Sequence, residues 1–362
     1  MRFIFLLFII LLILFVPKNH IQAKDTSPSI EIGAYLDTYY ATDNDKHSDS
    51  IGAGRLFSYL NPKKDQFALN IAQISAKIKY ENILRSNITF QFGDLPTMAW
   101  TNLGAKYPMI QQANAGVQLF QNCWLDAGFF LTHIGGEALL PKDNWLSTHS
   151  LLTFYEPYFQ AGVKVGYETD KFTACLHILN GNGIFDENNN NKTLGLYLSY
   201  TPSGLYSLSY GGVIGNEEPG DPVKAKVHML NNFVGQINPT DNLSIKAQFD
   251  YGTKDVENPN ESLETKNGKF IGYSLTGHYQ FNKQYSSTIR IDYADNADGI
   301  YLPAVKGLDL SLGAEYKPTD NSYIRIEGRM LQFDDKFKLF WDGTSYTKSR
   351  MELILNMGVW IN

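Results

Sequence analysis

Two pairs of neighbouring residues carry side chains that could act together in hydrolysis. Thr132 with His133, and His149 with Ser150, each place a hydroxyl beside an imidazole. A serine hydrolase needs these groups within hydrogen-bonding distance, and a third polar group that orients the histidine. Adjacent residues of an extended segment point to opposite faces, so His149 and Ser150 are poorly placed for this chemistry. Because no GxSxG, HExxH or glycine-rich phosphate loop occurs either, we expect no catalytic residues and no cofactor.

Metal binding is a second candidate chemistry, at the segment Asp186–Asn191. Its sequence, DENNNN, supplies oxygen atoms of the kind that Ca²⁺ prefers. The segment lacks the spacing and the glycine of a defined calcium loop. A solvated loop tip is therefore the favoured interpretation, and no metal site is predicted.

Ionisable side chains recur on one face of the predicted strands. Burying so many of them in a dry interior would be costly, whereas a water-filled interior removes that cost. They could form a charged pore wall that selects solutes, or cross-strand ion pairs that satisfy a polar interior. The predicted pore-lining set is Lys164, Lys246, Asp250, Arg290, Asp292, Asp309, Glu315, Arg325, Glu327, Arg329 and Glu352.

The face on which these ionisable residues lie follows from an alternation of apolar and polar residues that repeats from Ser29 to Asn362. In the last segment the apolar face is formed by Met351, Leu353, Leu355, Met357, Val359 and Ile361. Side chains of a strand point alternately to two faces. About sixteen such segments with polar residues on the second face are typical of a transmembrane β-barrel. A soluble β-sandwich also alternates, but its outward faces would be polar.

Short and long connections between these segments alternate along the chain. The short links are Glu81–Arg85, Gln121–Cys123, Glu168–Asp170, Pro202–Ser203, Pro239–Asn242, Asn282–Gln284 and Pro318–Asn321. The long ones are Thr42–Asp65, Pro96–Met109, Gly135–Tyr155, Gly181–Asn191, Gly215–Ala225, Lys254–Asn267, Asn296–Val305 and Asp334–Lys348. Short turns face the periplasm in outer-membrane barrels and long loops face outward. The pattern predicts an all-β, antiparallel transmembrane barrel of about 16 strands, with both termini on the periplasmic side.

Two local features refine this prediction. The stretch Phe67–Tyr80 loses its alternation between Ile71 and Ile74, which predicts a bulge or a wrong strand boundary there. Aromatic residues gather beside the short links, where rings favour the headgroup layer of a membrane. The predicted girdle consists of Tyr80, Tyr167, Phe172, Tyr200, Phe281, Tyr285, Tyr316 and Tyr323.

The N-terminal segment and the composition agree with an outer-membrane protein. Arg2, an apolar run from Phe3 to Val16 and a small residue at Ala23 predict a signal peptide over residues 1–23. Residues 24–362 are then a single barrel domain. Hydrophobic residues make up 43% of the chain, yet the mean hydropathy is −0.25, because half of each strand is polar. The net charge of −6 gives no indication of nucleic-acid binding.

The two cysteines are predicted to be unpaired. Cys123 lies at a turn and Cys175 on a strand two places further along. Second-neighbour strands are about 10 Å apart, beyond the ~7 Å that Cα atoms of a disulfide can span.

The third long connection is the candidate constriction. Leu139, Leu140, Leu151 and Leu152 would be unfavourable on an extracellular surface but could pack against the barrel wall. Loop 135–155 is therefore predicted to fold into the lumen, with a position on the rim as the alternative. The residues predicted to face the passage are Glu137, Lys142, Asp143, Asn144 and Trp145.

The same region resembles the putative β-barrel porin-2 family, also called OmpL-like porins, whose members show a pattern HIG-x-E, DNW, S-L and PYY-x-G-V. The matching residues are His133, Ile134, Gly135, Glu137, Asp143, Asn144, Trp145, Ser150, Leu151, Pro157, Tyr158, Gly162 and Val163. A second match surrounds Leu176, Asn180, Gly181, Asp186, Asn189, Asn190, Lys192 and Gly195. Phe159 stands where the family has a second tyrosine, and the chain ends in Ile361 and Asn362 instead of an aromatic residue. The resemblance covers the mature chain and implies a porin-like protein, without naming a substrate.

These observations predict an outer-membrane porin of a Gram-negative-type bacterium. It would form a water-filled pore for passive diffusion of small hydrophilic solutes or ions. A non-conducting barrel, or an enzymatic one of the lipase or protease type, is the alternative. The expected partners are membrane lipid and lipopolysaccharide, small hydrophilic solutes and the outer-membrane assembly machinery, without nucleic acid. A homotrimer is suggested by analogy with porins of this size.

Overall fold

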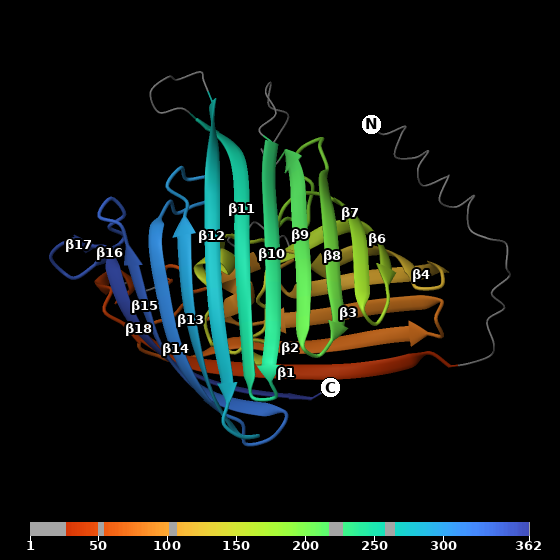
Figure 1. Ribbon diagram of the computed structural model, residues 1–362, viewed down its shortest axis with the longest axis horizontal. Coiled ribbons are helices and arrows are strands. Elements are labelled where there is room, and N and C mark those ends of the chain that lie inside the picture. The colour runs from red at the N-terminus through yellow and green to blue at the C-terminus, as the bar shows by residue number, and fades with distance from the viewer. Residues whose placement is uncertain (1–26, 50–53, 101–106, 217–226, 258–264, 362) are drawn as a thin grey trace.

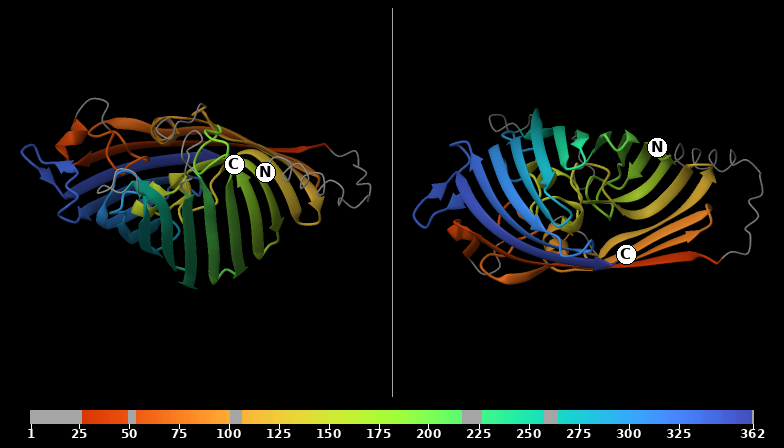
Figure 2. Two further views of the ribbon diagram at one scale, coloured as in Figure 1. Left: turned by 90° about the horizontal axis from the view of Figure 1, so that it is seen from above. Right: turned by 60° about the horizontal axis from the view of Figure 1, so that its bottom comes forward.

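Alternating strands close into one antiparallel barrel in the computed structural model, which describes residues 27–49, 54–100, 107–216, 227–257 and 265–361 (Figures 1 and 2). The predicted signal peptide, residues 1–23, lies outside the described residues. The barrel strands are β1 Ser29–Asp43, β2 Phe67–Tyr80, β3 Leu84–Phe92, β4 Ile110–Phe120, β5 Cys123–Leu131, β6 Phe159–Glu168, β7 Phe172–Leu179, β8 Thr193–Ser203, β9 Tyr206–Asn216, β10 Val227–Thr240, β11 Leu243–Glu257, β12 Thr265–Gln280, β13 Tyr285–Asp295, β14 Lys306–Tyr316, β15 Ser322–Phe333 and β18 Ser349–Ile361. β1 pairs with β18 and closes the barrel. The predicted fold class is confirmed.

Short turns and long loops alternate between consecutive strands, as the sequence predicts. Gln121 and Asn122 alone join β4 to β5, and Asn122 adopts φ 65°, a left-handed conformation that asparagine tolerates better than most residues. The long loops contain the short helices η1 Lys46–Asp49, η2 Pro96–Trp100, η3 Pro141–Asp143 and α2 Leu151–Tyr155, and the two-stranded sheet of β16 Phe340–Trp341 and β17 Tyr346–Thr347. None of the helices in the described ranges is long and apolar enough to cross a membrane.

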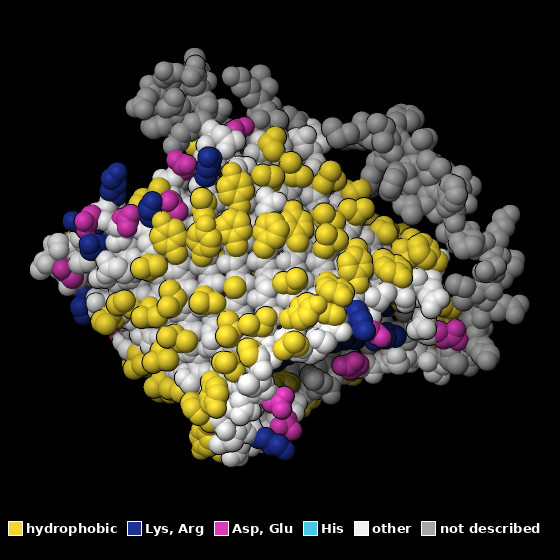
Figure 3. All heavy atoms as spheres, viewed as in Figure 1, with side chains coloured by type: hydrophobic (Ala, Val, Ile, Leu, Met, Phe, Trp, Pro, Cys, Tyr) yellow, Lys and Arg dark blue, Asp and Glu magenta, His cyan; other side chains and the backbone are white. Residues whose placement is uncertain are grey.

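The outer face of the barrel is apolar and the inner face polar. Along β18, Met351, Leu353 and Leu355 are exposed, whereas Glu352 and Ile354 between them are buried. Figure 3 shows the resulting cover of hydrophobic side chains over the outer face, with charged side chains gathered toward its margins. This distribution is the one expected where the surrounding solvent is hydrocarbon.

One aromatic residue of the predicted girdle lies inside the barrel. Tyr167, Phe172 and Tyr285 are exposed on the outside, at 40–50%. Tyr323 is 1% exposed and its hydroxyl contacts Tyr35 and Asp37. The prediction for Tyr323 was wrong because nearness to a turn was given more weight than the inward parity it shares with Arg325.

The irregularity in β2 lies beside the predicted interval. Asp37 pairs with Ile71 and Thr38 with Leu69, so Asn70 is the extra residue of a bulge. Both Asn70 and Ile71 are buried as a result, and Asn70 donates a hydrogen bond to Asp37.

Cys123 and Cys175 are free and buried.

Candidate functional site

The third long loop, here called loop 3 and comprising residues 132–158, lies inside the barrel (Figure 2, yellow-green). Leu146 is 2% exposed, and Leu151 and Leu152 are fully buried. Gly272 on β12 makes room for this packing, because a Cβ atom there would lie 2.6 Å from Cγ of Leu152. Apolar packing against the inner wall therefore holds loop 3 away from the rim.

Charged side chains of the wall bind the backbone of loop 3. Arg290 donates to the carbonyl oxygens of Thr148 at 2.8 Å and His149 at 3.0 Å. Arg325 donates to the carbonyl oxygens of Leu146 at 2.8 Å and Asn144 at 2.9 Å. The carboxylate of Glu327 accepts hydrogen bonds from the Ser147 and Thr148 amides at 2.6 and 3.0 Å. The wall thus satisfies peptide groups that would otherwise be buried without partners.

The arginines of this wall form ion pairs with carboxylates of the wall and of loop 3. The pairs are Arg290–Asp292 at 2.9 Å, Arg290–Glu137 at 2.9 Å, Arg325–Glu315 at 2.5 Å and Arg329–Asp309 at 2.6 Å. The buried wall residues are Asp250, Arg290, Asp292, Asp309, Glu315, Arg325, Glu327, Arg329 and Glu352, each at most 9% exposed. They face the interior, where most of them form an ionic network covered by loops; Asp250 instead accepts hydrogen bonds from Asn232 and Gln248. Lys164 and Lys246 are half-buried and border open cavities.

The five residues expected to face the passage have different positions. Glu137 is held by Arg290, and the Asn144 side chain braces the loop through the amide and carbonyl of Ala138. Trp145 stacks on His278 at 5.0 Å. Lys142 and Asp143 form an ion pair at 2.9 Å, with 20% and 48% of their side chains exposed. Asp143 is the one residue of the five that is exposed.

A second loop also enters the barrel, and the sequence analysis missed it. This loop, here called loop 1, comprises residues 44–66, of which 44–49 and 54–66 are described. Arg55 pairs with Asp43 at 2.7 Å and Glu352 at 2.5 Å, and all three side chains are fully buried. Phe57 contacts Phe154 of loop 3 at 4.9 Å between ring centroids. The run of apolar residues in RLFSYL, inside a predicted external loop, was the available signal.

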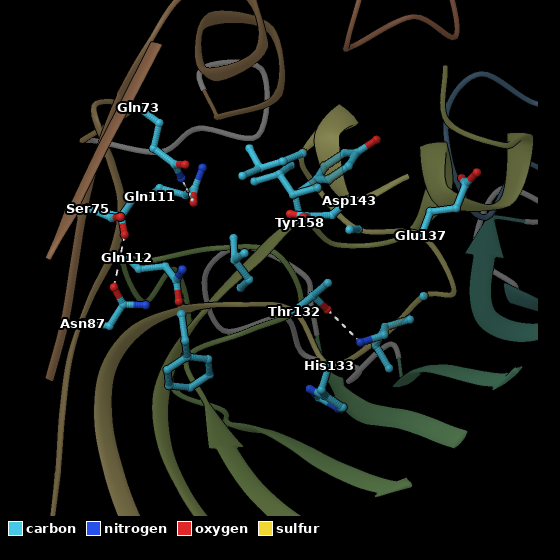
Figure 4. A pocket seen from close by; sticks show the side chains of 18 of the residues that line it. Gln73, Ser75, Asn87, Gln111, Gln112, Thr132, His133, Glu137, Asp143 and Tyr158 are labelled. Atoms are coloured by element: carbon cyan, nitrogen blue, oxygen red, sulfur yellow. Dashed lines mark hydrogen bonds between the residues drawn. The ribbon is translucent and has the colours of Figure 1, made fainter. Parts of the chain in front are cut away.

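Open space remains between loop 3 and the opposite wall. A cavity of about 600 Å³, here called the central cavity, is bordered by residues of β1–β8 and by loop 3. Figure 4 shows Gln73, Gln111 and Gln112 on one side of it and Tyr158 and Asp143 on the other. A second cavity of about 440 Å³ lies beyond residues 135–145 of the loop, against β8–β11.

The hydroxyl and imidazole pairs considered for hydrolysis have other partners. Ring nitrogens of His149 lie 2.9 Å from the Ala138 carbonyl oxygen and 3.3 Å from the Tyr158 hydroxyl. Ser150 accepts from the Thr153 amide at 3.1 Å and so caps α2. His133 contacts Gln160 and the Gly212 carbonyl. Within the described ranges, no group of three or more His, Cys, Asp or Glu residues could hold a metal ion.

Comparison with known proteins places the chain in a family. The sequence pattern of the family described as putative beta-barrel porin-2, OmpL-like, matches residues 29–359. The chain belongs to this family. A β-barrel of the OmpL-like porin family is a Gram-negative outer-membrane protein, and the family points to a channel. No curated protein matches the sequence.

Solved outer-membrane proteins share the fold of this OmpL-like porin. The anion-selective porin from Comamonas acidovorans has 11% sequence identity and a TM-score of 0.63, over 92% of this chain and 100% of that one. OmpT of Vibrio cholerae has 14% identity and a TM-score of 0.58, over 93% and 99%. The outer-membrane channel DcaP of Acinetobacter baumannii has 11% identity and a TM-score of 0.58, over 92% and 98%. At these identities the likeness establishes the barrel fold alone.

Glu137 should make the stability of this OmpL-like porin depend on pH. Burial raises the pKa of its carboxyl, but the Arg290 charge and the Ser150 amide help to lower it from 4.5 to about 2. A pKa lowered by folding means stabilisation above pH about 4.5 that is lost as the pH falls toward 2. We expect Glu137→Gln to lower the free energy of unfolding by roughly 3 kcal/mol near neutral pH, and by less as the pH falls.

Urea unfolding of the refolded protein over a pH series measures this difference. Asp143→Asn is the control, because Asp143 is an exposed loop carboxylate paired with Lys142. That substitution should cost at most about 1 kcal/mol. A difference for Glu137→Gln that does not change with pH would contradict the assignment.

Proposed function

We propose that the chain forms a water-filled pore for passive diffusion of small hydrophilic solutes or ions across the outer membrane. The observation that carries the proposal is the central cavity of about 600 Å³, which remains inside a closed barrel beside loop 3. Barrels of about 16 strands are wide enough to conduct, whereas barrels of about eight strands are filled by side chains.

Loop 3 narrows the pore in this proposal. Lys142 and Asp143 are the loop residues that permeating solutes would meet, with Lys164 and Lys246 on the walls of the two cavities. The remaining charges of the predicted pore lining would act from beneath the loop, as anchors that fix its position. The electrostatic field in the passage would therefore come mainly from these four side chains.

Conductance across a planar lipid bilayer tests the proposal. The mature chain, refolded in detergent and added to the bilayer, should produce discrete current steps. A folded barrel that inserts without current steps would exclude the pore and leave the non-conducting alternative. Ester and peptide hydrolysis by the same sample would support the enzymatic alternative, but His149 contacts the Tyr158 hydroxyl and Ser150 caps α2, which does not favour it.

We also propose a trimeric assembly that contacts lipid and lipopolysaccharide. One solved form of the Vibrio cholerae protein is described as a trimer. Exposed apolar residues on the outer face, among them Leu275, Ile291 and Leu312, would contact lipid or another copy. Delivery of the unfolded chain to the membrane would depend on the outer-membrane assembly machinery.

A further inference from the structure

Most side chains of the central-cavity wall on β2–β4 are polar and uncharged. Gln73 and Ser75 on β2, Asn87 and Thr89 on β3, and Gln112 on β4 border this space (Figure 4). The ionic network lies instead on β13–β15 and β18, where loops 1 and 3 cover it. The buried ionic network and the open space are therefore on different sides of the barrel.

Hydrogen bonds between amides fix part of this wall. Gln73 donates to Gln111 at 2.7 Å, Gln111 donates to Gln91 at 2.9 Å, and Gln91 donates to the Pro108 carbonyl oxygen at 3.0 Å. Gln111 and Gln91 are buried, while Gln73 at the start of the series is half-buried and borders the cavity. Each amide offers donors and an acceptor, so a series fixed at its buried end presents an oriented group to the solute.

The charges that do border the cavity occur as opposite-sign neighbours. Lys142 pairs with Asp143 at 2.9 Å, and Glu168 pairs with Arg85 at 2.8 Å. Arg85 also pairs with Asp126 at 2.5 Å, and Asp126 lies directly across from Lys164 in the pairing of β5 with β6, so Arg85 and Lys164 are balanced by Asp126 and Glu168. Since neighbouring charges of opposite sign cancel at a distance, the cavity gives little electrostatic preference to cations or anions.

Three other charged positions do not alter this balance. Lys77 lies directly across from Glu31 in the pairing of β1 with β2. Glu156 is 6% exposed, and its burial and the nearby Asp250 raise its pKa well above the usual value, which favours the neutral carboxyl. Glu137 is held by Arg290. The charged groups at the margin are thus compensated or neutral.

Aromatic rings complete the cavity. Tyr35, Phe130, Tyr158 and Tyr197 border it, the last of these half-buried. Rings present apolar faces to C–H groups, while amides and hydroxyls exchange hydrogen bonds with solute hydroxyls. A pocket of this volume lies in the range that binds small molecules.

We propose that the central cavity is a binding section of the passage for uncharged, polyhydroxylated solutes of sugar size, in preference to ions of either sign. The inference rests on the proposed pore function. A hydroxyl both donates and accepts, and so matches an amide wall, whereas an ion gains little from compensated charges.

Block of the ionic current by sucrose in a planar bilayer tests the inference. In a salt gradient the reversal potential should lie close to zero, and sucrose should reduce the current of the mature protein in a saturable manner. The double variant Gln73→Leu/Gln112→Leu should weaken sucrose binding by about tenfold, the effect of losing the net contribution of one or two hydrogen bonds.

Gln236→Leu is the matched control, because Gln236 borders the second cavity instead of the central one. It should leave sucrose affinity unchanged. A large reversal potential without block by sucrose would overturn the inference while leaving the pore function intact. Equal block in the double variant and the parent would also overturn it, and a protein without current would reject the pore function itself.

Discussion

Replacing residues 137–152 by a short glycine-serine link should raise the single-channel conductance several-fold. The removed segment separates cavities of about 600 and 440 Å³ inside one barrel, so its loss would join them. It carries Leu146, Leu151 and Leu152, which are buried against the wall and exclude water from it. Without them the passage would widen toward β11–β15, where the ionic network would become hydrated. Conductance of single insertions in a planar bilayer measures the change.

The control for this deletion is a short deletion in the exposed tip of another loop. Residues 187–190 lie between β7 and β8, and Glu187 and Asn188 are exposed. Their deletion should leave the conductance unchanged. If the loop 3 deletion also left it unchanged, the passage would not run beside loop 3.

Arg290→Met should destabilise the barrel by about 3–5 kcal/mol, the typical cost of removing one partner from a buried ion pair. Arg290 is 1% exposed and bonds Glu137, Asp292 and two carbonyl oxygens of loop 3. Methionine fills a similar volume but leaves the carboxylates and carbonyls without a donor. Urea unfolding of the refolded protein gives the difference in free energy.

Two further variants separate the network from a general effect of substitution. Lys192→Met removes an exposed ion pair with Glu187 and should cost at most about 1 kcal/mol. Arg290→Met/Glu137→Gln removes both members of the buried pair. If Arg290 acts through Glu137, the second substitution should cost less in the Arg290→Met background than in the parent. Strict additivity would show that the two side chains act independently.

Much of the fold could be predicted because successive residues of a strand point to opposite faces, so polar and apolar residues alternate in the sequence. The polar and apolar parity of β18, for example, is the same in the sequence and in the barrel. Short links rich in proline, asparagine and aspartate placed the turns. Tyr323 shows where this approach fails. Its alternation with Arg325 indicated an inward side chain, whereas its position beside a short turn indicated the outer aromatic girdle.

The candidate site was only partly predictable, because its geometry depends on contacts between distant segments. Charges at Arg290, Arg325 and Glu327 indicated a polar interior, but alternation cannot tell water from the peptide groups of a folded loop as their partners. Loop 3 was recognised by its leucines. Loop 1 carries Leu56, Phe57 and Leu60 in a similar pattern, yet its main anchor is Glu352, which lies 297 residues from Arg55 in sequence.

The place where the barrel closes has a consequence for assembly. Arg55 of loop 1 is held between Asp43 on β1 and Glu352 on β18, and these two strands come together only when the first and last strands pair. Pairing across such a separation is the slowest kind of contact to form. The two ion pairs of Arg55 therefore cannot both form while the sheet is still open between β1 and β18. Closure of the barrel and placement of loop 1 inside it therefore occur together. The pore reaches its final width only when β1 has paired with β18.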